Sequence, residues 1–104
     1  MSLAALLADR ASDLADVESA AADDGAVTWS RGGRPFAELS GDGSTAGFAL
    51  DAAIAAAAIR TPDVAPSARG PGWVAFTPAV LDDHAADRAV AWFASAYRRL
   101  VPRD

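Results

Sequence analysis

The chain has 104 residues, no cysteine and a net charge of −5 at pH 7. A chain of this length forms a single domain with one hydrophobic core, and the absence of cysteine excludes disulfides, thiolate nucleophiles and thiolate metal sites. The charge is concentrated near the N-terminus: residues 1–25 hold six acidic residues and one arginine, whereas residues 26–50, 51–81 and 82–104 are each neutral.

The first predicted element is a helix that begins after Ser2, which is a good N-cap residue. Its apolar positions recur at helical spacing and define one face: Leu3, Leu6, Leu7 and Leu14. Asp9 and Arg10 interrupt the apolar run, so we expect a helix here and not a secretory signal. No stretch approaches the roughly 18 consecutive apolar residues of a membrane span. We therefore expect a cytoplasmic protein that does not contact membranes.

A meander of strands is predicted next. Residues 17–22 fit either a prolonged helix or a short strand, and Asp23-Asp24-Gly25 ends this segment. The strands are expected at 26–30, 35–40 and 45–50, joined by turns at Gly32-Gly33 and at 41–43. Two-residue Gly-Gly turns favour positive φ. Strands joined this tightly are antiparallel neighbours.

The second half of the chain begins with a short helix at 52–60, which Asp51 caps and Thr61-Pro62 stops. Residues 64–72 are predicted to be a loop, followed by a strand at 73–77. Trp73, Ala75 and Thr77 should share one face of this strand, with Val74 and Phe76 on the other. A last helix should run from Asp82 or Asp83 to about Leu100, with one buried stripe: Ala86, Val90, Phe93, Tyr97 and Leu100.

Four segments resemble a known family. TWSRGGRPFAEL (28–39), RTPD (60–63), GPGWVAF (70–76) and a helix ending in AYRR (96–99) occur in the order typical of the MmcQ/YjbR family, over residues 16–100 or so. The matching positions are Trp29, Gly33, Phe36, Trp73, Ala96 and Tyr97, and Arg34 replaces the usual lysine. The small luciferase-like domain family is similar too, with a Gly-Trp-Val strand before a helix that ends near tyrosine. The first resemblance implies an antiparallel sheet backed by helices, and DNA binding through a "double-wing" motif.

Arginine side chains are the candidates for nucleic-acid binding: Arg31, Arg34, Arg69, Arg98, Arg99 and Arg103. Arg31 and Arg34 flank the Gly-Gly turn, where they either grip a phosphate together or simply lie in a solvated turn. The six residues converge only if the hairpin turn, the 64–72 loop and the C-terminus share one face. A sequence pI near 4.6 is far from the basic value typical of nucleic-acid-binding domains. The solvated turn is therefore the favoured interpretation, and any DNA binding should be weak.

We expect no catalytic residue, metal site or cofactor. His84 is the only histidine, and beside Asp82, Asp83 and Asp87 it reads as an exposed first-turn residue. The serines lie in no nucleophile motif. Trp29 and Trp73 are expected in the core, whereas Trp92 should be half-exposed and stacked by Arg88.

Together, these patterns predict a single α+β domain over residues 1–104. An antiparallel sheet of four to five strands, a meander plus a later strand, should pack against the N- and C-terminal helices. The leading functional hypothesis is a non-catalytic binding or interaction domain of unknown partner, with a homodimer as one form. One alternative is a DNA-binding protein that uses the hairpin arginines, and a second is a small-molecule site between the sheet and residues 66–72.

Overall fold

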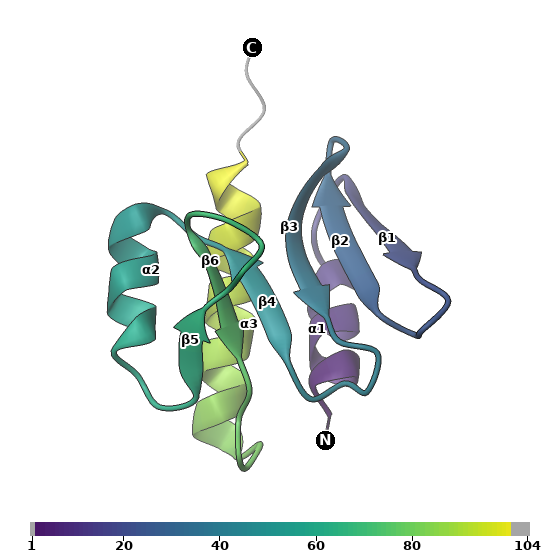
Figure 1. Cartoon of the computed structure of the whole chain (residues 1–104). Coiled ribbons are helices and arrows are strands. Elements are labelled where there is room, and N and C mark those ends of the chain that lie inside the picture. The colour runs from purple at the N-terminus through teal and green to yellow at the C-terminus, as the bar shows by residue number, and fades with distance from the viewer. Residues whose placement is uncertain (1, 101–104) are drawn as a thin grey trace.

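The computed structural model describes residues 2–100 and has an α+β fold, as the sequence predicts (Figure 1). Its elements, in chain order, are α1 (Leu3–Ser12), β1 (Val17–Ala21), β2 (Val27–Arg31), β3 (Arg34–Leu39), β4 (Ala46–Ala49), α2 (Ala52–Ile59), β5 (Val64–Pro66), β6 (Trp73–Phe76) and α3 (Asp83–Arg99). The described strands form one antiparallel sheet with the order β1-β2-β3-β4-β6-β5.

Two strands, β1 and β5, lie where the sequence does not clearly predict a strand. Residues 17–22, which the sequence left open, form β1 beside β2. Residues 64–66, predicted to be part of a loop, form β5, which pairs with β6 through Val64↔Phe76 and Pro66↔Val74. A three-residue strand that ends in proline has no alternating pattern of its own, and only its pairing with β6 makes it a strand. The sheet thus has six strands.

The hairpin between β2 and β3 has the predicted turn. Gly32 and Gly33 have φ angles of 58° and 78°, and positive φ at both central residues matches the twist of a two-residue hairpin. The pairing shifts farther along, because Trp29 lies opposite Ala37 while Ser30 lies opposite Pro35. Phe36 is the extra residue of this bulge.

The core lies between one face of the sheet and the helices α1 and α3. Phe93 of α3 is fully buried, and its ring meets Trp29 and Phe36 edge-on at centroid distances of 5.4 and 5.1 Å. The helix α2 instead contacts β5 and β6 at the other end of the sheet. Figure 1 shows α1 and α3 behind the sheet and no helix in front of it. Within residues 2–100, one face of the sheet is therefore not covered by a helix.

The helix ends agree with the predicted capping residues. The Ser2 hydroxyl accepts a hydrogen bond from the Ala5 N–H at 3.1 Å, and the Asp82 carboxylate accepts one from Ala85 at 2.8 Å. Asp51 precedes α2 as predicted, but its carboxylate makes no capping hydrogen bond.

Four apolar positions are less buried than the sequence predicts. Val90 is only half-buried, because it faces the gap between α3 and α1, and the buried stripe of α3 runs through Ala89 in its place. On the predicted apolar face of α1, only Leu3 and Leu7 are buried: Leu6 is half-buried beside the groove between α1 and α3, and Leu14 lies past the end of the helix and is half-buried. Trp73 is half-buried on the uncovered face of the sheet, since it alternates with the fully buried Val74. Trp92 is half-buried as predicted, with the Arg88 guanidinium 5.8 Å from its ring centre.

Candidate interaction surfaces

The two hairpin arginines have different environments. Arg31 donates a hydrogen bond from Nη1 to the carbonyl of Tyr97 at 3.0 Å, and its guanidinium lies 3.9 Å from the centre of the Tyr97 ring. Arg34 is exposed, and within residues 2–100 it takes part in no side-chain hydrogen bond or ion pair. Arg31 therefore connects the hairpin to α3, and the two side chains do not act as an equivalent pair.

The hollow beside this turn is mixed in charge. It measures about 450 Å³, and besides Arg31 and Arg34 it is lined by Asp16, Val17, Glu18, Gly32 and Leu100. Two carboxylates in the same hollow oppose the binding of an anion.

Two further candidate arginines also form ion pairs with residues of the same chain. Arg69 forms an ion pair with Glu38 at 2.7 Å, and its guanidinium lies 4.5 Å from the centre of the Trp73 ring. Arg99 lies 3.6 Å from Asp51. Arg98 is exposed, and Arg103 lies outside the described residues.

The segments that carry these arginines nevertheless lie at one end of the molecule. The β2–β3 turn, the β5–β6 loop and the C-terminal end of α3 are together at the top of Figure 1. Arg31, Arg34, Arg98 and Arg99 belong to the turn and to the end of α3. Arg69 belongs to the loop, but its guanidinium is directed to Glu38, four residues along β3 from Arg34. Arg31, Arg69 and Arg99 each have a partner within the molecule.

Acidic residues collect at the opposite end. The β1–β2 and β3–β4 turns lie side by side there, since a Cβ atom added at Gly41 would overlap the carbonyl oxygen of Asp24. The link between α2 and β5 lies beside the end of β6, where the Thr77 N–H donates a hydrogen bond to the backbone carbonyl of Asp63. With the start of α3, these segments are spread over the width of the sheet (Figure 1), and their acidic residues are Asp23, Asp24, Asp42, Asp63, Asp82, Asp83 and Asp87. His84 is exposed in the same region, in the first turn of α3.

The carboxyl group of Asp42 organises the β3–β4 turn. The N–H of Ser44 and the hydroxyls of Ser40 and Ser44 donate hydrogen bonds to it at 2.7–3.0 Å. These donors lower the pKa of Asp42 from 3.8 to about 2. Because its partners all belong to the turn, the lowered pKa reflects the local structure of the turn.

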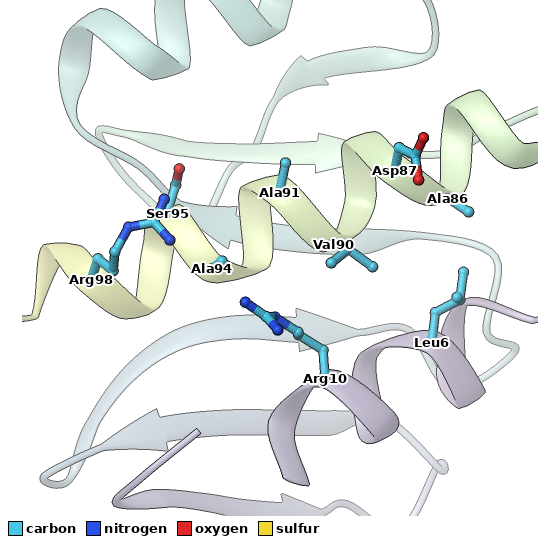
Figure 2. Close-up of a pocket in the computed structure, with 9 residues that line it drawn as sticks. All are labelled: Leu6, Arg10, Ala86, Asp87, Val90, Ala91, Ala94, Ser95 and Arg98. Carbon is cyan, nitrogen blue, oxygen red and sulfur yellow. The ribbon is translucent and has the colours of Figure 1, made fainter. Parts of the chain in front are cut away.

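A shallow groove runs between α1 and α3 (Figure 2). Ala86, Val90 and Ala94 of α3 face α1, whereas Asp87 and Ser95 project to another side of α3. Arg10 reaches from α1 across the groove toward α3. The polar groups of this hollow of about 450 Å³ therefore do not converge on one point.

The uncovered sheet face also has a small hollow, of about 210 Å³. Thr28, Glu38, Gly47 and Ala75 are among its lining residues. Typical small-molecule sites measure roughly 300–1,000 Å³, so this hollow is small for a drug-sized ligand. The neighbouring loop is held against the sheet by the Arg69–Glu38 ion pair.

The outer edge of β1 differs from these hollows, because along the whole strand the outward backbone groups have no neighbouring strand within residues 2–100. The Ala22 N–H donates a hydrogen bond to the backbone carbonyl of Ala26 at 2.8 Å. At every second residue from there, Ala20 and Glu18 turn their backbone groups toward Thr28 and Ser30 of β2. Alternate residues of an antiparallel strand turn both backbone groups to the same neighbour. The N–H and C=O groups of Val17, Ser19 and Ala21 therefore point outward, where no strand within residues 2–100 pairs with them. The four residues Glu18–Ala21 are exposed.

The two edges of the sheet are protected unequally. The strand β5 is three residues long, ends in Pro66 and contacts α2; short length, proline and a covering helix all block edge pairing. The strand β1 has five residues, no proline and a single charge, at Glu18. Beside it, a cavity of about 240 Å³ opens between β1 and α1. The sequence predicts neither feature, because which strand lies outermost depends on the order of the whole sheet.

Comparisons with protein-family models, with curated proteins and with solved structures found no match. Within residues 2–100, no group of three or more His, Asp or Glu side chains is placed to hold a metal ion. In the same part of the chain, no helix has the length and apolar character to cross a membrane.

Proposed function

We propose that this chain is a non-catalytic protein-interaction domain, and that it binds an extended segment of a partner along the outer edge of β1. The observation that carries this proposal is the open edge itself. The backbone groups of Val17, Ser19 and Ala21 point outward, Ser19 and Ala21 are exposed, and the strand lacks the usual protection of an edge. An extended peptide that pairs there gains main-chain hydrogen bonds and becomes an additional strand.

The proposal can be tested by removing one outward N–H. Proline is tolerated on an edge strand where the N–H faces solvent, so Ser19→Pro should keep the β1–β2 ladder and block pairing on the outer side. Ser19→Ala is the matched control, because it removes the hydroxyl and keeps the N–H. Thermal unfolding of each variant checks that it is folded, and Ala21→Pro replaces Ser19→Pro if the latter fails.

The probe is a displayed library of random peptides. We expect wild type and Ser19→Ala to enrich a common set of peptides that Ser19→Pro does not retain. If no enriched peptide distinguishes Ser19→Pro from Ser19→Ala, β1 is not a binding edge and the proposal is wrong.

DNA binding is the second candidate, and the gathering of arginines at one end of the molecule favours it (Figure 1). We rank it lower because Arg31, Arg69 and Arg99 already have internal partners. The exposed Arg34 and Arg98 are therefore the residues to change. If this end binds duplex DNA, Arg34→Ala/Arg98→Ala should weaken binding at low salt and reduce the salt dependence by up to about two phosphate contacts. Fluorescence anisotropy measures both, and equal weak binding by wild type and variant would reject this function.

A further inference from the structure

We infer that the segment which pairs with β1 is basic and inserts an aliphatic side chain between β1 and α1. This inference rests on the interaction function proposed above and specifies the chemistry of the partner. It uses two features that the edge alone does not explain: the cavity beside β1 and the concentration of negative charge around the strand.

The added strand would present its side chains to two environments. Ser19 lies opposite Trp29, whose ring packs on Phe93 of α3. Directly paired residues share a face of the sheet, so Ser19 faces the helix layer and Glu18 faces the uncovered side. Side chains of a strand alternate between the two faces of the sheet, and an added strand would do the same. Every second residue of the partner would therefore point toward α1, and the residues between them would lie on the same face as Glu18.

The cavity accepts an apolar side chain. Its volume is about 240 Å³, and its lining comes from α1, β1 and β2: Ala8, Ala11, Ser12, Val17, Ser19 and Trp29. These side chains are small or apolar, and none of them is charged. An aliphatic residue fits this lining, and burial there would remove its surface from water.

The surroundings of the edge favour positive charge. Residues 9–24, which lead into β1, form it and leave it, contain six acidic residues and only Arg10 as a basic one. Arg31 and Arg34 lie near the Val17 end of the strand, but Arg31 is already bonded to Tyr97, so the charge along the strand remains negative in excess. The two ion pairs of the described residues, Arg69–Glu38 and Arg99–Asp51, involve none of these six. Glu18 is exposed on the strand itself. A lysine or arginine opposite Glu18 would form a favourable cross-strand pair.

The same charge opposes a second copy of this chain as the occupant. Pairing β1 with its own copy would bring together two segments that each carry a net charge of −5. Like charges placed face to face disfavour association. The structure therefore favours a basic peptide over a symmetric dimer at this edge.

Three variants test the two parts of the inference separately. Glu18→Gln removes the charge on the strand and keeps its size. Ala8→Leu fills the cavity from an exposed position of α1, and Ala4→Leu is its control, since Ala4 is exposed one turn earlier and is not among the residues that line the cavity. The probes are the peptides that bind wild type and Ser19→Ala but not Ser19→Pro. Ser19→Pro keeps every charge of the protein, so peptides held only by nonspecific attraction would remain on it.

We expect these peptides to alternate basic and aliphatic residues and to bind more weakly as ionic strength increases. Glu18→Gln should lower the affinity for these peptides about twofold to fivefold, the range expected for one cross-strand charge pair. Ala8→Leu should weaken them about tenfold or more, as expected when an aliphatic side chain loses its burial, and Ala4→Leu should have no effect.

The outcomes separate this inference from the proposed function. Edge-dependent peptides that lack basic residues, and that Glu18→Gln and Ala8→Leu do not affect, would leave the function standing and overturn the inference. A wild-type dimer in sedimentation that Ser19→Pro converts to a monomer would overturn it too, since the occupant is then a second copy. The absence of any edge-dependent peptide would reject the proposed function itself.

Discussion

Arg31 shows how one side chain can connect a surface hairpin to a helix. Its charge-assisted hydrogen bond to the Tyr97 carbonyl and its position over the Tyr97 ring join β2 to α3, elements that are far apart in the sequence. Arg34, its direct partner across the hairpin, makes no comparable contact within residues 2–100. Two arginines that look equivalent in the sequence therefore have unequal roles.

We expect Arg31→Ala to lower the free energy of unfolding by about 1–2 kcal/mol, the contribution of a hydrogen bond from a charged donor together with a partly exposed cation–π contact. Arg34→Ala should change it by less than about 0.5 kcal/mol, and in the stabilising direction, because repulsion across the hairpin is relieved. Urea denaturation of the two variants measures both values. Equal losses would mean that the Tyr97 contact does not stabilise the hairpin.

At the scale of single elements, the turn between β3 and β4 is organised by a carboxylate. The three donors around Asp42 require its ionised form, and they lower its pKa to about 2. A lowered pKa in the folded state means that the contribution of Asp42 is present above its ordinary value and is lost as the pH falls through the folded value.

We expect the carboxyl resonance of Asp42 in an NMR titration to change with a midpoint near pH 2, and the amide signal of Ser44 to follow it. In Asp42→Asn, the Ser44 amide should no longer show this acid transition. A midpoint at the ordinary value of 3.8 would mean that the turn does not hold the carboxylate as described.

The elements also show what the sequence predicts and what it does not. The Gly32-Gly33 turn, the alternation in β6 and the length of α3 are encoded in local patterns, so they were predicted correctly. The strand β5 was not, because Val64–Pro66 is too short to show an alternating pattern. Val90 has the correct spacing for a buried residue, but only α1 covers that side of α3, and Val90 lies beside the resulting groove.

At the scale of the whole molecule, charge and strand order decide where binding is favoured. The sequence locates the net charge in the N-terminal segment but does not predict that this segment forms an edge of the sheet. That position follows from β6, which inserts between β4 and β5 and leaves β1 at the opposite edge. The proximity of Arg31 and Arg34 to the end of α3 has a similar origin, since only the complete fold brings the β2–β3 hairpin next to that helix (Figure 1).

The strand order also implies an order of folding. The strands β1 to β4 pair with their neighbours in sequence, so each pairing closes only a short loop. The helix layer is different: the Tyr97 hydroxyl donates to the carbonyl of Ala15, 82 residues away, and α1 packs against α3. Because closing a long loop takes more chain entropy than closing a hairpin, we expect the meander to form early and α1 to dock on α3 late. The chain would then complete its fold when α1 and α3, one from each half of the chain, pack together on one face of strands that have already paired.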